Sequence, residues 1–376
     1  MPSTHRRAGT TRRRLVRTGL LLAVAAVLSA CSGDQSALNP QGPYAQKPDD
    51  LFQIVFIIAV VVFVLVQGLI IFTAVRFKAK DGDDTLPVQV HGNTRLEIFW
   101  TVIPALILAG ISVPTIQQIF DLDERPDDAM VVEVIGHRWW WEIRYPDTGI
   151  ITANEMVIPE DVPIRLEMRA EEEGRADNGV IHSYWIPALA GKQDVVPGRV
   201  VTLNLQADHP GRYLGQCAEY CGLSHANMRN RAVVLTQEDF DQWVLDQQAG
   251  AAVPEGNAEA MAGREVFQNT CAACHSIREN SVASADDFVA NRGPNLTHLM
   301  SRKEFAGAIF DLYVPDGNGG FTDEVNVEDL RAWILNAPSM KAMRPPDVGM
   351  PSFAEGGDAL TEDELDQLIA YLTTLQ

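Results

Sequence analysis

Two long apolar runs early in the chain constrain its fold more than any other feature. Residues 51–77 and 98–119 contain no charged side chain apart from Arg76. At about 1.5 Å of rise per helical residue, each run is long enough to cross a hydrocarbon core of roughly 30 Å. We therefore expect a transmembrane helical hairpin over residues 51–120. The alternative, two buried helices of a soluble domain, fits poorly with runs of this length and composition.

The charges that flank these runs predict the orientation of the hairpin. The connecting segment is basic and the outer ends are acidic: Arg76, Lys78, Lys80 and Arg95 against Asp49, Asp50, Asp121, Asp123 and Glu124. Basic loops favour the cytoplasmic side of a membrane. We therefore expect the connecting loop in the cytoplasm, and the N-terminus and the rest of the chain outside a bacterial cytoplasmic membrane.

The first residues have the order of an export signal. A cluster of arginines precedes the apolar stretch LLLAVAAVLSA, which ends at Cys31. This order of a basic segment, an apolar segment and small residues predicts that residues 1–30 are removed. LSAC, residues 28–31, resembles the bacterial lipobox, in which the cysteine is lipidated; the alternative is a routine signal-peptidase site beside an unremarkable cysteine. Residues 31–50 would then form an extracytoplasmic N-terminal segment.

Length and charge restrict the number of domains and the class of partner. A chain of 376 residues suggests two or three folded units rather than one compact core. The formal net charge is −20, and acidic residues dominate the chain after Phe120. Nucleic acid is therefore excluded as a partner on electrostatic grounds.

The pattern of residue types along the chain changes after the second apolar run. Short segments rich in β-branched residues, separated by Pro, Gly and Asp, occur between residues 130 and 235: MVVEVIG, VPIRLEM, RVVTLNL and RAVVL. This pattern is typical of a small antiparallel sandwich or barrel. We assign this domain to residues 121–246, and we expect the loop before RAVVL to be held rigidly by strands at both ends.

That loop carries a dense set of metal-binding side chains. QCAEYCGLSHANM, residues 216–228, contains Cys217, Cys221, His225 and Met228. The two cysteines could form a disulfide, which is the usual fate of paired cysteines outside the cytoplasm. Thiolate, imidazole and thioether together are, however, the ligands favoured by copper in electron-transfer sites, and zinc seldom recruits methionine.

The spacing C-x-E-x-C-x-x-x-H-x-x-M resembles the binuclear copper (CuA) motif of cytochrome c oxidase subunit II, and the resemblance extends over residues 50–235, the hairpin included. It implies a cupredoxin-like fold. It also implies that Cys217 and Cys221 bridge two copper ions. The other implied ligands are His182 and His225, the weakly bound Met228, and the main-chain carbonyl of Glu219.

Further segments carry the same resemblance. GHRWWWEIRY, residues 136–145, resembles the aromatic stretch of this family, which implies that Trp139 lies over the copper site and accepts the electron. Core packing or anchoring at the membrane interface is the alternative for these tryptophans. The element Asp-x-x-Pro-Gly-Arg begins at Asp194, which the family would use for coupling to subunit I; a turn acid on a solvated surface is the alternative.

Two glutamates receive possible roles from the resemblance. The carboxylate of Glu219 would approach a magnesium or manganese ion shared with subunit I, or else lie exposed and unpaired. Glu97, in EIFWTVIPA, would lie at the mouth of a proton path into subunit I. A carboxylate at a helix N-terminus is stabilised by the helix dipole in any protein, so Glu97 also has a purely structural explanation.

A second unit follows the Ala- and Gly-rich segment 247–258, which has no apolar period and indicates a linker. CAACH has the C-x-x-C-H form of a c-type haem attachment site, in which Cys271 and Cys274 bind the porphyrin and His275 binds the iron. RGPNL and the amphipathic TEDELDQLIAYLTTL support this assignment. Residues 259–376 resemble an all-α class I cytochrome c.

A cytochrome of this class normally supplies a methionine on the other side of the iron. Met350, in GMPSF, fits best, because such methionines often precede proline in a loop ahead of the last helix. Met340 and Met343 lie in the same region, where packing or surface positions explain them, and His298 is a weaker rival. The choice matters because a thioether ligand raises the redox potential.

The two sites together predict the electron-entry subunit of a respiratory cytochrome c oxidase. Haem c would take electrons from cytochrome c or a cytochrome-bearing complex and pass them to copper, and then to subunit I for oxygen reduction coupled to proton pumping. The membrane helices lack the histidines that an oxygen-reducing centre needs, so subunits I and III are expected partners.

Four rival functions share parts of this pattern. A quinol oxidase subunit II keeps the hairpin and the sandwich as structural parts but lacks the copper ligands. A copper-delivery protein would have no use for covalent haem. A nitrous oxide reductase would need a large propeller domain, for which the chain has no room. A membrane-tethered cytochrome without a working copper site is the last alternative.

Overall fold

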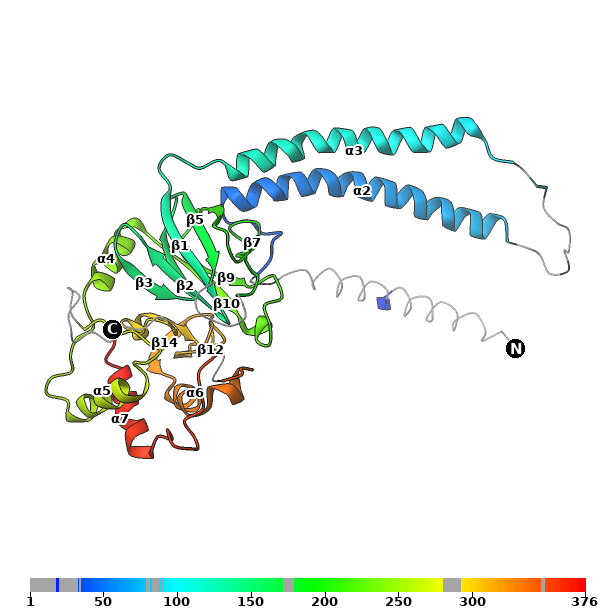
Figure 1. The fold of residues 1–376 in the computed structure, drawn as a ribbon. Coiled ribbons are helices and arrows are strands. Elements are labelled where there is room, and N and C mark those ends of the chain that lie inside the picture. The colour runs from blue at the N-terminus through cyan, green and yellow to red at the C-terminus, as the bar shows by residue number, and fades with distance from the viewer. Residues whose placement is uncertain are drawn as a thin grey trace, which may run out of the picture.

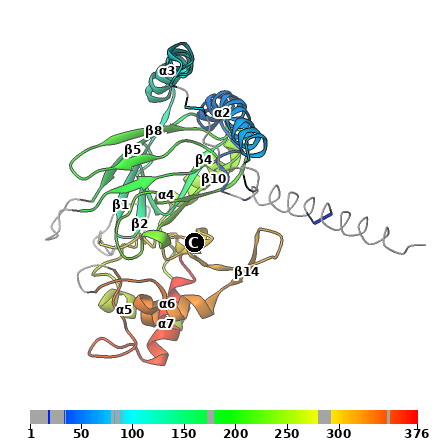
Figure 2. The ribbon, with the colours of Figure 1, turned by 90° about the vertical axis from the view of Figure 1, so that its right-hand side faces the viewer.

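The computed structural model describes residues 35–78, 91–171, 179–279, 292–345 and 349–376, together with residues 18, 19, 33, 82, 88 and 89. A helical hairpin extends from a β domain, and a helical C-terminal domain packs on the opposite end of that β domain (Figure 1). Figure 2 shows the same arrangement from the side. Most of the predicted export signal, Cys31 and Lys80 lie outside the described residues, so the lipidation of Cys31 stays a prediction.

The predicted hairpin is present as two long helices that lie side by side. Helix α2 spans Pro43–Arg76 and helix α3 spans Thr94–Asp123. Both are long and apolar enough to cross a membrane, with mean hydropathies of 3.3 and 2.0 over their most apolar windows. Helix α2 begins well before residue 51 because Pro43 can occupy a first turn, where its missing N–H costs nothing. Asn93 caps α3 by accepting hydrogen bonds from the backbone of Arg95 and Leu96.

The β domain consists of two main sheets and a short two-stranded ribbon. The five-stranded sheet has the order β3-β2-β1-β5-β8, and the three-stranded sheet has the order β4-β10-β9. The strands are β1 (Met130–His137), β2 (Trp140–Tyr145), β3 (Ile150–Ala153), β4 (Glu155–Pro159), β5 (Ile164–Ala170), β8 (Val201–Leu205), β9 (Gly211–Gln216) and β10 (Arg229–Leu235), and the ribbon pairs β6 (His182–Tyr184) with β7 (Gln193–Val195).

The cupredoxin-like sheet domain predicted from the sequence is confirmed, but its sheets are mixed rather than purely antiparallel. Strand β1 pairs in parallel with β5, and β4 pairs in parallel with β10. Strand β4 crosses to the second sheet before β5 returns to the first, so β5 enters beside β1 in the same direction. Alternation of apolar residues fixes the face of a strand but not the direction of its neighbour.

The two sheets enclose one apolar core that also contains the sulfur ligands. Strand β5 alternates strictly between buried and half-buried residues, as expected for a strand with one face on the core. Trp141 and Tyr184 are fully buried and meet edge to face at 5.0 Å. Cys217, Cys221 and Met228 belong to the same cluster of buried residues. The sulfur side chains of the loop are therefore part of the core, whereas Tyr220 and Leu223 of the same loop are exposed.

Helix α4 (Gln237–Gln248) closes the β domain and leads directly into the C-terminal domain. Thr236 caps the helix, and Trp243 packs against Tyr145 at 5.2 Å. The segment predicted as a linker is anchored near its start. Ala251 is fully buried, and its N–H donates to the carbonyl of Arg278 at 2.8 Å.

The helical C-terminal domain is also confirmed, with additional short strands. Helices α5 (Ala258–Thr270), α6 (Val327–Met340) and α7 (Glu362–Leu372) surround a second core that includes Phe267, Leu365 and Tyr371. A capping box between Thr361 and Glu364 begins α7. Two short hairpins precede α6: β11 (Glu304–Phe305) with β12 (Phe310–Asp311), and β13 (Tyr313–Pro315) with β14 (Phe321–Val325).

Candidate metal centre

Strand ends position the sulfur-rich loop between β9 and β10. Cys217 directly follows β9, and Met228 directly precedes β10. The N–H of Cys217 donates to the carbonyl of Met228 at 2.8 Å, which closes the base of the loop. The N–H of Ala218 donates to the carbonyl of Ser183 at 2.9 Å, next to His182 at the start of β6. These bonds bring His182 to the loop although it lies far away in the sequence.

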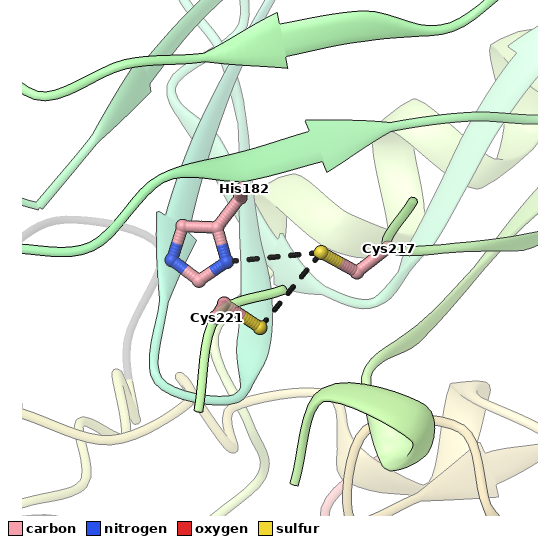
Figure 3. A group of neighbouring side chains, drawn as sticks. All are labelled: His182, Cys217 and Cys221. Atoms are coloured by element: carbon pink, nitrogen blue, oxygen red, sulfur yellow. Dashed lines mark hydrogen bonds between the residues drawn. The ribbon is translucent and has the colours of Figure 1, made fainter. Parts of the chain in front are cut away.

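The first group of donor atoms surrounds Cys217. Its Sγ lies 3.8 Å from Sγ of Cys221, so the two residues are free thiols rather than a disulfide. Nδ1 of His182 lies 4.0 Å from the same sulfur, and the carbonyl oxygen of Glu219 lies 3.3 Å from it. His182, Cys217 and Cys221 are buried and converge on one point (Figure 3).

The second group of donor atoms surrounds Cys221. Nδ1 of His225 lies 3.7 Å from the Cys221 sulfur, and Sδ of Met228 lies 3.8 Å from it. Each thiol therefore has one imidazole and one weaker donor of its own, while the two thiols face each other. All six ligands that the sequence resemblance implied lie in one cluster.

The two thiols influence each other's protonation. The hydrogen bond between them lowers the pKa of Cys217 well below its ordinary value, and it raises the pKa of Cys221. Burial raises the pKa of Cys221 further, because a charged thiolate is disfavoured away from water. A soft metal ion that displaces the shared proton would have both sulfurs as thiolate ligands.

This donor set fits copper better than other common metals. Thiolate, imidazole and thioether are soft or borderline ligands, whereas calcium and magnesium take oxygen ligands. Zinc sites use cysteine and histidine but rarely a thioether. Met228 is fully buried, with its sulfur directed at Cys221, so this thioether belongs to the donor set.

Trp139 lies against the cluster, as the resemblance implied. Its indole N–H donates to the carbonyl of Cys221 at 2.9 Å, and the side chain is buried. Trp141 serves the core: its ring meets the ring of His182 at 5.5 Å and so supports that ligand from behind. Core packing was the alternative given for these tryptophans from the sequence. Trp139 lies in the turn between β1 and β2, whereas Trp141 lies in β2.

The C-x-x-C-H segment follows helix α5 in the C-terminal domain. Cys271 and Cys274 are partly buried free thiols. Nδ1 of His275 lies 2.9 Å from the carbonyl oxygen of Pro294, and a proton donated there leaves Nε2 as the ring atom available to iron. Burial lowers the pKa of His275, which favours the neutral, ligating form. Gly293 is needed beside the ring, because a Cβ there would lie 2.8 Å from Cε1 of His275.

The candidate axial residues occupy different positions. Met350 is half-buried, and its N–H donates to Sδ of Met343 at 3.3 Å. Met343 packs against the core of the β domain, and Met340 ends helix α6. Nδ1 of His298 lies 2.7 Å from the carbonyl oxygen of Gln376, and Nε2 lies 2.9 Å from that of Ala249, so this ring joins two ends of the chain. The choice of Met350 over Met340, Met343 and His298 stays a prediction.

The remaining predicted acids occupy three separate places. Glu219 is half-exposed, and its carboxylate accepts a hydrogen bond from the N–H of Tyr220; it lines a cleft beside Trp139 and Cys221. Asp194 is exposed on β7. Glu97 is in the first turn of α3, where the helix dipole stabilises a carboxylate. The functional roles of these acids stay predictions.

Comparison with known families agrees with the three structural parts. The profile of the transmembrane domain of cytochrome c oxidase subunit II matches residues 35–118, and that of its periplasmic domain matches residues 150–235. The cytochrome c profile matches residues 260–376.

Individual relatives extend over most of the chain. The cytochrome c oxidase subunit 2 of Alkalihalophilus pseudofirmus is 34% identical over 93% of this chain and 94% of its own length. The Bacillus subtilis protein of the same name is 31% identical over 86% and 88%. The quinol oxidase subunit 2 of Bacillus spizizenii is 35% identical over 61% of this chain and 71% of its own length. A crystal structure of the periplasmic domain of subunit II of cytochrome oxidase from Bradyrhizobium japonicum, 28% identical, aligns with a TM-score of 0.30 over 33% of this chain and 96% of its own.

Proposed function

Because this chain belongs to the cytochrome c oxidase subunit II family, we propose that it is the electron-entry subunit of a respiratory oxidase and relays electrons from a covalent haem to a binuclear copper centre. The family and the cytochrome c domain make it an electron-transfer subunit, anchored in a membrane, that works with other oxidase subunits. The family also implies a copper centre and a haem.

The arrangement of donors around the two thiols carries the proposal. Cys217 and Cys221 would bridge two copper ions, since each sulfur faces both the other thiol and its own pair of donors. His182 and the Glu219 carbonyl would complete one side, and His225 and Met228 the other. When bound, two copper ions that share one unpaired electron through two thiolates would change geometry little on reduction, which suits fast electron transfer at small driving force.

The C-terminal domain would hold haem c by Cys271 and Cys274, with His275 and Met350 as axial ligands. The hydrogen bond between His275 and Pro294 fixes the ring orientation, as partners of metal-bound histidines commonly do. The haem would supply a one-electron carrier whose potential is raised by the thioether. Trp139 would be the entry point to copper, since its indole N–H binds the carbonyl of Cys221.

The direction of the chain across the membrane completes the proposal. We place both redox domains on the extracytoplasmic side of a bacterial cytoplasmic membrane, with oxygen reduction and proton pumping in subunit I and with subunit III as a further partner. The electron donor would be cytochrome c or a cytochrome-bearing complex, steered by the acidic surface. Glu219 is proposed to share magnesium or manganese with subunit I, Glu97 to guard a proton path, and Asp194 to couple to subunit I.

The chain would then divide into six parts. We propose a lipoprotein-type signal over 1–30, an extracytoplasmic segment over 31–50, the hairpin over 51–120, the copper domain over 121–246, a linker over 247–258, and the cytochrome domain over 259–376. The helix bounds differ from these divisions by a few residues, since α2 begins at Pro43, α3 ends at Asp123 and α4 ends at Gln248.

The copper-free role of a structural subunit is less consistent with the site. Quinol oxidase subunit 2 proteins are relatives of this chain. A subunit without copper would have no need for two buried free thiols with two imidazoles and a thioether within 4.0 Å of them. The same geometry disfavours a tethered cytochrome with no working copper site.

Metal analysis of the full-length protein tests the proposal. The chain would be produced in a host that attaches haem c, and copper and iron would be measured together with the electron paramagnetic resonance spectrum of the oxidised protein. We expect two copper ions per haem and hyperfine splitting from both copper nuclei. Haem without copper, with Cys217 and Cys221 found as a disulfide, would reduce the chain to a tethered cytochrome with a structural β domain.

A further inference from the structure

A buried cluster of charges joins the β domain to the C-terminal domain. Arg212 binds Glu155 within the β domain at 3.2 Å, and it also binds Glu304 of the C-terminal domain. Arg231 binds the other oxygen of Glu304 at 2.7 Å. Glu155 accepts the backbone N–H groups of Lys303 and Glu304 at 2.9 and 3.0 Å. The two carboxylates and two guanidinium groups form a network with fixed geometry, which favours one orientation of the domains.

A strained loop of the C-terminal domain lies next to this cluster. Residues 306–308, which we call the interdomain loop, all have positive φ, including Ala306 at 56° and Ala308 at 57°. Non-glycine residues adopt this conformation only where the surroundings hold them in it. The carbonyl of Gly307 accepts the N–H of Arg229 at 3.1 Å, and the carbonyl of Ala308 accepts Arg231 at 3.2 Å. Arg229 directly follows Met228, so the loop contacts the β domain beside the copper ligands.

Lys341 connects the interdomain loop to Trp139. Its side chain is almost completely buried just beyond helix α6. The side-chain nitrogen donates to the carbonyl of Trp139 at 2.7 Å and to the carbonyl of Ala306 at 2.7 Å. Burial lowers the pKa of Lys341 to about 7, so the group is an ammonium below that pH and a neutral amine, still a donor, above it. The indole of Trp139 donates in turn to the carbonyl of Cys221. A continuous series of hydrogen bonds therefore runs from the C-terminal domain through Lys341 and Trp139 to the loop over residues 217–228, which we call the copper loop.

The residues after Lys341 strengthen the same contact. The hydroxyl of Ser224, in the copper loop, donates to the carbonyl of Ala342 at 2.6 Å. Met343 packs against the core of the β domain, and its sulfur accepts the N–H of Met350. Residues 341–343 therefore lie between the copper loop and the segment that carries the proposed haem ligand.

We propose that Lys341 is a positioning residue that holds the C-terminal domain in one fixed pose on Trp139, so that the haem-to-copper step needs no swinging of the domain. The redox consequence rests on the function proposed above, whereas the docking itself does not. Undocking would remove the ammonium from two carbonyls and separate the buried ion pairs, which opposes free motion on the linker.

The test compares full-length variants with and without the buried ammonium, at about pH 6, where Lys341 is protonated. Lys341→Met removes the charge at nearly constant side-chain length, and Lys341→Arg keeps a cation. Lys192→Met is the matched control, because Lys192 is an exposed lysine of the β domain. Hydrogen exchange at the amide of Arg229 reports docking directly, since this N–H donates across the interface to Gly307.

We expect Lys341→Met to speed exchange at the Arg229 amide by about tenfold, as the loss of a buried hydrogen bond to a charged group implies. Haem-to-copper transfer should slow and become dependent on solvent viscosity, because docking would then precede each transfer. The midpoint potential of the haem should stay unchanged. That of copper should fall, because the positive charge of Lys341 acts on Cys221 and its loss favours the oxidised site. Lys341→Arg should restore part of both effects, and Lys192→Met should behave as the unsubstituted protein.

The outcomes separate this proposal from the proposed relay. Unchanged Arg229 exchange and unchanged transfer in Lys341→Met would overturn the positioning role while the relay stands. Bound haem and copper that exchange no electron in the unsubstituted protein would overturn the relay, and the exchange experiment would still decide the docking. If Lys341→Met fails to fold, Gly307→Ala provides a second variant, since alanine already occupies the positive-φ positions 306 and 308. Its Cβ would lie 2.4 Å from Nζ of Lys341, so we expect the same defects from it, and their absence would also overturn the proposal.

Discussion

Individual residues of the candidate metal centre belong both to the packed core and to the cluster of donor atoms. Met228 is fully buried in the β-domain core and at the same time directs its sulfur at Cys221. Trp139 binds the copper loop through its indole and the C-terminal domain through its carbonyl. Trp139 therefore contacts the loop with the donor atoms through one hydrogen bond and the C-terminal domain through another.

Replacement of Met228 tests whether the proposed copper and haem sites are independent of each other. Met228→Leu removes the thioether but keeps an apolar side chain of similar volume, so the cost in stability should stay below about 1.5 kcal/mol. We expect the copper potential to rise, by on the order of 60 mV for a tenfold change in the one-electron equilibrium, because a weak electron donor to the oxidised site is lost. Redox titration of both centres measures this shift. A change in the haem spectrum would show that the sites are not independent.

At the scale of elements, local patterns predicted the long helices and some of the strands. The hairpin, four of the strands and the copper loop were identifiable because period, turn residues and ligand spacing act over short distances along the chain. The pairing of the strands was not identifiable, because the alternation of apolar and polar residues does not specify which strand lies alongside. The strands β11–β14 are too short to show a period, and Glu304 in β11 is fixed by arginines of another domain.

The contact between Lys341 and Trp139 could not be predicted from the sequence for the same reason, because it joins distant parts of the chain. Lys341 and Trp139 are 202 residues apart in the sequence, and nothing near either residue indicates the other. His182, by contrast, was predicted only through the family resemblance. A buried lysine is unusual, but its burial is visible only in the folded structure.

The buried His137, the last residue of β1, should make the free energy of unfolding depend on pH. His137 lies between Glu142 and Glu171, at 3.1 and 3.0 Å, and its ring stacks on Trp140. Burial alone would lower the pKa of His137, but the two hydrogen-bonded carboxylates raise it above its ordinary value. A raised pKa in the folded state means that the stabilisation is fully present below the unfolded-state value and is lost as pH rises through the folded-state value.

His137→Gln should therefore be most damaging at acidic pH. We expect a loss of about 2 kcal/mol near pH 6, the usual cost of removing a buried charged hydrogen bond, and a smaller loss near pH 9. Thermal unfolding of both proteins at the two pH values measures the difference. An equal loss at both values would mean that His137 contributes by packing rather than by charge.

At the scale of the whole molecule, the docked C-terminal domain covers the backbone of Trp139. Under the proposed relay electrons enter at the haem, so the electron donor would dock on the C-terminal domain. The covalent connection would mainly secure assembly, since the charge cluster and Lys341 already fix the pose.

Lengthening the linker distinguishes fixed docking from swinging. An insertion of four residues, alternating Gly and Ser, after Gly256 would lie at an exposed turn. A Cβ built on Gly256 would have no heavy atom within 4 Å. A fixed pose predicts an unchanged haem-to-copper rate, whereas a tethered, mobile domain would slow as its effective concentration falls. Insertion is preferable to shortening residues 250–256, because shortening would also remove the buried contact of Ala251. A slower rate in the longer variant would favour swinging.

The order in which haem and copper are reduced tests the proposed relay most directly. A flash-excited cationic ruthenium complex, bound to the acidic surface of the assembled oxidase, would inject one electron while haem and copper absorbance are recorded. The relay predicts that haem is reduced first and is then reoxidised at the same rate at which copper becomes reduced. Copper that is reduced while the haem stays oxidised, or haem that stays reduced beside oxidised copper, would contradict it.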